Sequence, residues 1–140
     1  MIARLALALL LAAMAAGQLA DLGGFADILR SYEVFGAAAG AVAVVIPLAE
    51  LTAAAALLAG RRFGGRLALV VAVFWSVLGA QAFARGLVIE NCGCFGVYLG
   101  QELRWWVLLQ DAYFLLLVWY AAVASGLGWP LPRLRATTTP

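Results

Sequence analysis

Residues 34–59 read VFGAAAGAVAVVIPLAELTAAAALLA and contain one charged side chain, Glu50. An α-helix needs about 20 predominantly apolar residues to cross the hydrocarbon layer of a bilayer, so this stretch predicts a membrane span. Its small residues, such as the alanines of 53–56, favour close packing against a neighbouring helix. Pro47 lies one turn before Glu50 and predicts a kink that frees a backbone carbonyl near the carboxyl group.

Three other apolar runs bounded by charged residues cover 5–20, 67–89 and 103–127. The whole chain of 140 residues is 66% hydrophobic and 11% charged, whereas soluble domains have roughly 25% charged residues. We therefore expect an all-α polytopic membrane protein, a four-helix bundle formed by residues 1–128. Residues 129–140, rich in Pro and Thr, are expected to form a short tail.

The first run also has features of a secretory signal peptide. It has one Arg, an apolar stretch and Ala-x-Ala sites around residues 13–16, the pattern of a cleavable leader. Cleavage would leave three spans with the chain ends on opposite sides of the membrane. Nothing else in the sequence supports that arrangement, so we expect the first run to be a retained span.

The positions of the arginines predict the orientation of the chain. Connections on the cytoplasmic side of membrane proteins carry an excess of basic residues. In a four-span arrangement six of the nine basic residues lie on one side: Arg4, Arg61, Arg62, Arg66, Arg133 and Arg135. Both termini are therefore expected in the cytoplasm, and residues 90–102 on the outer side. The net charge of +2 is too small and dispersed to predict a nucleic-acid surface.

The most reactive segment is Asn91-Cys92-Gly93-Cys94-Phe95-Gly96, between the third and fourth runs. The chain has two Cys and no His, which excludes a His-based catalytic dyad. Two thiols separated by one Gly can close into a small ring, and strain in such a ring makes the disulfide a better oxidant. Because disulfide exchange takes place outside the cytoplasm, Cys92 and Cys94 are the predicted catalytic residues.

Two other uses of the cysteine pair stay open. The cysteines could form a static bridge or pack as small apolar residues. Metal binding is the less favoured use, because two thiolates without His do not complete a tetrahedral site. A linear Cu(I) site, or a site shared across a dimer, would need only these two ligands from one chain. Cys92 follows polar Asn91 and is expected to be more exposed than Cys94, and thus to be attacked first in an exchange.

Two carboxyl groups lie inside predicted spans, and a charge at mid-bilayer costs roughly 2.5 kcal/mol or more. Glu50 and Asp111 are therefore expected to face the bundle interior, as part of a proton path or as structural hydrogen-bond partners. By depth, Gln81 should meet Asp111 beneath the cysteine loop, with Glu50 deeper. Arg85 is expected either to favour a thiolate in the loop or to extend to the membrane interface.

Trp105 and Trp106 lie at the predicted outer boundary of the fourth span. Tryptophan is enriched at membrane interfaces, where it anchors helices. A quinone ring stacked on either indole is the alternative use, and quinone is the one cofactor that we expect.

A family resemblance follows from the order of these elements. Pro47-x-x-Glu50, Arg85, Cys92-Gly93-Cys94-Phe95-Gly96 and Asp111 together resemble the methylamine-utilisation MauE family, a relative of DoxX-like membrane proteins. The resemblance covers about residues 6–127, and the Cys-Gly-Cys-Phe-Gly element is its most specific part. It implies a four-helix membrane protein with thioredoxin-like partners, or a role in maturation of the methylamine dehydrogenase small subunit.

One position departs from the family pattern. A basic residue is expected near the end of the first span, where this chain has Gln18-Leu19-Ala20-Asp21. With the loop, the resemblance favours a thiol-disulfide oxidoreductase of the cell membrane that exchanges disulfides with an extracytoplasmic thioredoxin-like protein or a client, coupled to quinone. The direction of electron flow stays open. The competing interpretation is a non-enzymatic assembly or transport subunit whose cysteines only hold the loop.

Overall fold

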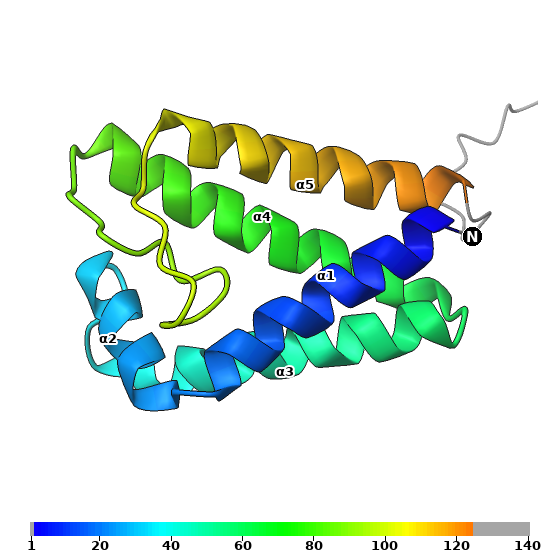
Figure 1. Ribbon diagram of the computed structural model, residues 1–140, viewed down its shortest axis with the longest axis horizontal. Helices are drawn as coiled ribbons and strands as arrows, with labels where there is room; N and C mark the ends of the chain where they lie inside the picture. Colours follow the sequence, from blue (N-terminus) through cyan, green and yellow to red (C-terminus); the bar gives the residue numbers. More distant parts are fainter. Residues whose placement is uncertain (1, 125–140) are drawn as a thin grey trace, which may run out of the picture.

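The computed structural model describes residues 2–124, and every regular element within them is a helix. Four long helices lie side by side as a bundle (Figure 1). In chain order they are α1 (Ile2–Leu19), α3 (Ala39–Leu58), α4 (Arg62–Ala84) and α5 (Trp105–Ala124). The connection between α1 and α3 holds two short elements, α2 (Leu22–Ser31) and the 3-10 helix η1 (Gly36–Ala38).

All four predicted spans are confirmed as helices long and apolar enough to cross a membrane. Large apolar side chains such as Leu9, Val70 and Leu116 point outward from them, as expected of a surface that meets lipid rather than water. The chain is therefore a multi-pass membrane protein. The last three residues of the predicted fourth span and the predicted tail lie outside the described residues.

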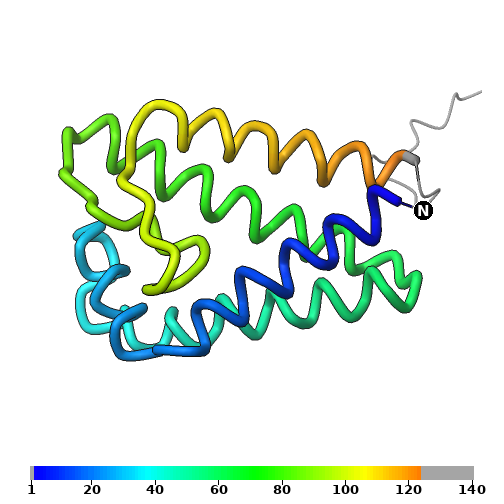
Figure 2. Tube along the Cα trace, in the orientation of Figure 1, coloured from blue at the N-terminus to red at the C-terminus, as the bar shows by residue number. Residues whose placement is uncertain are grey.

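The arrangement of the helices leaves one seam of the bundle open. α1 packs along α3, α3 against α4, and α4 against α5. α1 and α5 meet near the end that carries the N-terminus and separate toward the other end, where the loop of residues 85–104 and α2 lie (Figures 1 and 2). The cysteine loop thus enters the bundle at the wide end of the seam between α1 and α5.

The third span begins earlier than predicted, at Arg62 rather than at residue 67. The turn before it is short, with Gly60 at a φ of +69° and Arg61 as the N-cap of the helix. Gly64 is already helical and lies against α3, because a Cβ placed on it would be 2.8 Å from the backbone nitrogen of Leu57. The glycine-rich stretch thus serves close packing of two helices as well as the turn.

The third span also ends earlier, at Ala84 rather than at residue 89. Gly86 adopts a φ of +69°, the left-handed conformation that ends helices at glycine. The amide of Leu87 then donates to the carbonyl of Ala82 at 3.0 Å, the bond of a Schellman cap. The early end leaves a long connection, residues 85–104, which contains both cysteines.

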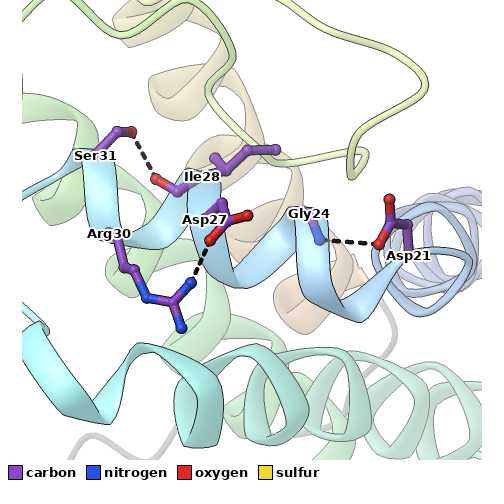
Figure 3. A network of polar contacts seen from close by, with 6 residues as sticks. All are labelled: Asp21, Gly24, Asp27, Ile28, Arg30 and Ser31. Atoms are coloured by element: carbon purple, nitrogen blue, oxygen red, sulfur yellow. Dashed lines mark hydrogen bonds and ion pairs between the residues drawn. The ribbon is translucent and has the colours of Figure 1, made fainter.

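The short helix α2 was not predicted. Its N-cap is Asp21, whose carboxylate accepts a hydrogen bond from the amide of Gly24 at 2.9 Å (Figure 3). An ion pair between Asp27 and Arg30 lies on its exposed face. Its apolar face is buried on the core through Phe25, Ala26 and Leu29. α2 is thus an amphipathic helix that covers the end of the bundle beside the cysteine loop.

Candidate functional site

The backbone of the cysteine loop lies directly on α1. A Cβ placed on Gly96, whose φ is +71°, would be 2.0 Å from the carbonyl oxygen of Gly17. A Cβ on Gly17 would in turn be 2.2 Å from the carbonyl oxygen of Phe95. Only glycine fits at both places. The loop is therefore a re-entrant segment seated in the bundle rather than a free outer connection.

Asn91 holds the loop in its folded form. Its side-chain oxygen accepts from the amide of Gly93 at 2.9 Å, and its side-chain nitrogen donates to the carbonyl of Gly96 at 3.1 Å. The amide of Cys92 donates to the carbonyl of Gln101 at 2.8 Å, which ties the two arms of the loop together. These bonds fix the backbone on both sides of each cysteine.

Tyr32, at the end of α2, fixes the loop from the other side. Its hydroxyl donates to the carbonyl of Cys92 at 2.8 Å, and burial raises the pKa of Tyr32 well above its usual value, so the donor proton is retained. Arg85 donates to the carbonyl of Tyr32 at 3.3 Å and forms an ion pair with Glu33 at 2.8 Å. Among the described residues Arg85 has no hydrogen bond to either cysteine, so its support of the loop is indirect.

The two cysteines are unlike one another. Both are free thiols, but Cys92 is 4% exposed whereas Cys94 is only partly buried. The expectation that Cys92 is the more exposed is therefore wrong, because the loop turns inward at this point and α2 covers it. A hydrogen bond from the Cys94 thiol lowers the pKa of Cys92 to about 7. The same bond, together with burial, raises the pKa of Cys94.

A buried polar cluster lies beneath the loop. Glu50 on α3 has no exposed surface and accepts from Trp75 Nε1 at 2.9 Å and from Gln18 Nε2 at 3.3 Å. Gln18 also donates to the carbonyl of Cys94 at 3.0 Å. Glu50 is thus linked to the cysteine loop through the side chain of Gln18. The expectation that Glu50 lies deeper than this did not include the re-entry of the loop into the bundle, for which the sequence has no clear pattern.

Two oxygens of this cluster have no hydrogen-bond partner among the described residues, Glu50 Oε2 and Gln18 Oε1. An unpaired buried acceptor costs about 1–3 kcal/mol. A proton on Glu50 Oε2 removes the charge from the buried carboxyl group, and the two groups that donate to Glu50, from Trp75 and Gln18, are neutral. The surroundings therefore suit a neutral carboxylic acid at the base of the loop.

We expect Glu50→Gln to keep the fold and Glu50→Leu to destabilise it. Gln keeps an acceptor for Trp75 and provides an N–H for Gln18, whereas Leu leaves two buried donors unpaired at about 1–3 kcal/mol each. Thermal unfolding in detergent, followed by tryptophan fluorescence, measures the difference. Thr52→Leu is the matched control, because Thr52 lies on the same helix but is exposed. Equal loss of stability in the Gln and Leu variants would contradict the assignment.

Asp111 and Gln81 do not meet, contrary to expectation. Asp111 lies against Gly79, where a Cβ would be 3.0 Å from Asp111 Oδ2. Gln81 lies two residues further along α4 and so faces another side of the helix. Its oxygen accepts from Arg85 at 3.2 Å, and it lines a surface groove with Phe35 and Phe74. The prediction rested on the similar depth of the two residues in their spans. Depth does not determine how each helix is rotated about its axis, and this rotation decides which side chains meet.

A cavity of about 230 Å³ opens at the seam between α1 and α5. Cys94 and Asp111 both line it, from the loop and from α5. Its remaining wall is largely apolar and aromatic, formed by Leu10, Met14, Trp75, Phe95, Gln101, Val107, Gln110, Tyr113 and Phe114. The cavity connects the partly buried cysteine with an acidic group inside a membrane span.

Trp105 and Trp106 begin α5 at the same end of the bundle, with their ring centroids 5.9 Å apart in an edge-to-face arrangement. The guanidinium of Arg104 lies 5.4 Å from the ring of Trp106. Both indoles are exposed, and neither lines the cavity. Gln18, Tyr32 and Trp75 contact the loop or Glu50 but were not predicted. A polar Gln inside an apolar run was the one indication in the sequence.

The comparisons with known proteins agree with the resemblance found in the sequence. The family model described as methylamine utilisation protein MauE matches residues 1–125. Neither a curated protein nor a solved structure matches the chain. Among residues 2–124 no group of three or more His, Cys, Asp or Glu side chains is placed to hold a metal ion.

Proposed function

We propose, for a chain that belongs to the methylamine utilisation MauE family, that this membrane protein is a thiol-disulfide oxidoreductase that uses Cys92 and Cys94. The observation that carries the proposal is the asymmetry of the pair. Cys92 has a pKa of about 7 because the neighbouring thiol donates to it, whereas Cys94 keeps its proton. One thiolate and one thiol in contact are what a two-step exchange requires.

The exchange follows from these two protonation states. The Cys92 thiolate attacks one sulfur of a partner's disulfide, a mixed disulfide forms, and the partner's other sulfur leaves as a thiolate. Cys94 then loses its proton and attacks Cys92, so that the loop disulfide closes and the partner leaves as a dithiol. The same steps in reverse oxidise a dithiol. We propose quinone as the carrier that exchanges these two electrons within the membrane.

The proposed partner is a thioredoxin-like protein on the outer side, and the client proposed from the family is the small subunit of methylamine dehydrogenase. The proposed orientation, with both termini cytoplasmic, rests on the arginine distribution. The helix start of α1 and the turn with Arg61 lie at the end of the bundle opposite the loop (Figure 1). Exposed Val88, Tyr98 and Leu99 flank the cysteines and offer an apolar surface for a partner.

A second candidate function is supported by the burial of Cys92. A pair in which one thiol is 4% exposed also suits a loop staple in a non-enzymatic assembly or transport subunit. In that case the cysteine pair would only hold the loop on α1, and no disulfide exchange would take place.

The experiment that separates the two is a trap of the mixed disulfide. In Cys94→Ser the Cys92 thiolate lacks the resolving thiol, so an adduct with an exported thioredoxin-like protein should accumulate and be visible on non-reducing gels. Cys92→Ser should trap much less. The control is Glu90→Cys in a chain without Cys92 and Cys94, which presents an ordinary exposed thiol on the same loop. No adduct from either single variant, with both fully active, would favour the staple.

A further inference from the structure

We propose that the cavity between α1 and α5 binds the ring of a membrane quinone, and that Asp111 exchanges a proton with that ring while the cysteine pair gives it two electrons. The inference rests on the proposed function, and it goes beyond it by assigning a binding site and a proton-exchanging residue. Trp105 and Trp106, the aromatic residues expected to stack on a quinone, do not line this cavity.

The position of the cavity suits a ligand that arrives through the lipid. Leu10 and Met14 of α1 form one wall, and Val107 and Phe114 of α5 form another. Gln110 and Tyr113 also line it and are exposed on α5, a helix that spans the membrane. Its mouth therefore faces the region occupied by lipid tails, where quinones are dissolved.

The size and lining of the cavity suit a ring. Apolar cavities of about 150 Å³ take up benzene, so a cavity of about 230 Å³ has room for a substituted quinone ring with its tail in the lipid. Aromatic side chains, Trp75 and Phe114, provide faces and edges for such a ring. The amides of Gln101 and Gln110 provide donors for quinone oxygens.

Asp111 is the observation that points to a ligand. It is 7% exposed, it lines the cavity, and its carboxyl group has no hydrogen bond or ion pair within residues 2–124. Gly79 leaves room for it, because any larger residue there would place a Cβ 3.0 Å from Asp111 Oδ2. An ionisable group inside a span is costly, and it is retained where it has a partner or a function. The missing partner is supplied by a polar ligand in the cavity.

A lipid tail would fill the same cavity but would need neither the carboxyl group of Asp111 nor the thiol of Cys94. An acyl chain does not hydrogen-bond to a carboxyl and does not react with a thiol. A quinone uses both, because its reduction takes two electrons and two protons. The Cys94 S–H bond breaks, one S–S bond forms between Cys94 and the Cys92 thiolate, and the two electrons pass to the quinone. Asp111 accepts the proton of Cys94 and passes it to one quinone oxygen, so its own state is restored. The solvent supplies the second proton at the other oxygen, and the quinone leaves as a quinol.

The test uses the full-length protein in lipid nanodiscs, reduced and freed of reductant. Decylubiquinone and 2,3-dimethyl-1,4-naphthoquinone are the probes, since neither has a free ring position that alkylates thiols. Loss of thiols is followed by maleimide-polyethylene glycol gel shift, and quinol formation by absorbance. Leu10→Trp fills the cavity, and Leu9→Trp is its matched control on the exposed face of α1. Asp111→Asn keeps the shape but not the proton exchange.

We expect at least one quinone to oxidise the wild-type pair with equal amounts of quinol formed. Leu9→Trp should match wild type, Leu10→Trp should be at least tenfold slower, and Asp111→Asn about 100-fold slower, in the range of general acid–base catalysis. Exchange with dithiothreitol is measured for every variant, and each quinone rate is divided by it, so that a general change in thiol reactivity is not counted. Wild-type rates in Leu10→Trp or in Asp111→Asn would overturn the assignment.

Two other outcomes separate this inference from the function on which it rests. If neither quinone oxidises the wild-type pair while exchange with a thioredoxin-like protein is normal, the quinone site is wrong and the oxidoreductase proposal stands. If the wild-type pair neither exchanges with that protein nor reacts with quinone, both proposals fail.

Discussion

Alkylation of Cys92 by iodoacetamide should slow about tenfold for each pH unit below 7 in the reduced, solubilised protein. Only the thiolate reacts, and the hydrogen bond from Cys94 places the pKa of Cys92 at about 7. Above pH 8 the rate should level off, because the thiolate is then fully formed. Rates over pH 5–9 come from mass spectrometry of the peptide that contains Cys92. Its burial slows alkylation at every pH, and the effect of burial on the midpoint is already contained in the pKa of about 7.

The control for this prediction is the pair Cys94→Ser and Cys94→Ala. Ser retains an O–H that can donate to Cys92, so the midpoint should stay below that of an ordinary thiol. Ala removes the donor, and the midpoint should rise toward or above the ordinary value of about 8.5, since burial then acts alone. A wild-type midpoint near 8.5, unchanged by Cys94→Ala, would show that the pair has no thiolate at neutral pH.

Gly17→Ala should displace the cysteine loop from the bundle. The new Cβ would lie 2.2 Å from the carbonyl oxygen of Phe95, and neither the helix nor the loop backbone can yield without losing hydrogen bonds. Overpacking of this kind costs about 1–3 kcal/mol. Cys92 should then become accessible, with maleimide labelling at least tenfold faster than in wild type. In the Gly17→Ala background, Cys94→Ala should no longer change the pH midpoint of Cys92.

Gly65→Ala is the matched control for Gly17→Ala. Both residues are helical glycines in membrane spans, but a Cβ on Gly65 meets nothing within 4 Å. This variant should label like wild type and unfold at the same or a slightly higher temperature, because alanine in a helix is favoured over glycine by roughly 0.5–1 kcal/mol. Identical behaviour of the two variants would mean that the loop does not rest on α1 in the membrane.

The spans could be predicted because the bilayer imposes a length and an apolar composition on each helix. α2 could not be predicted in this way, because it has only ten residues and only three buried apolar side chains. It has neither the length nor the apolar composition of a membrane span. Asp21 is a suitable N-cap residue, but an aspartate between two apolar runs does not by itself predict a helix. The early end of α4 depends on Gly86, whose positive φ is one of several roles open to glycine in a sequence.

The candidate site was only partly predictable for a different reason. Cys92, Cys94, Glu50 and Asp111 could be predicted as site residues from their chemistry. A thiol is reactive, and a carboxyl group inside a membrane span costs free energy. Which of them meet depends on the rotation of each helix and on the re-entry of the loop. The bonds from Gln18 to Glu50 and to Cys94 cross 32 and 76 residues of sequence, and no periodicity in a single chain encodes such contacts.

The contact of Gly17 with the loop has a consequence for the order of assembly. Gly17 and Gln18 are synthesised early, whereas residues 91–96 emerge only after α3 and α4 have been made. The seat for the loop is therefore complete before the loop itself exists. A ribosome-bound intermediate that ends before residue 92 carries no cysteine. When the loop is made, α1, α3 and α4 are already there to receive it. In the proposed orientation, which puts the loop in an oxidising outer compartment, this order limits the time during which two unprotected thiols meet unrelated proteins.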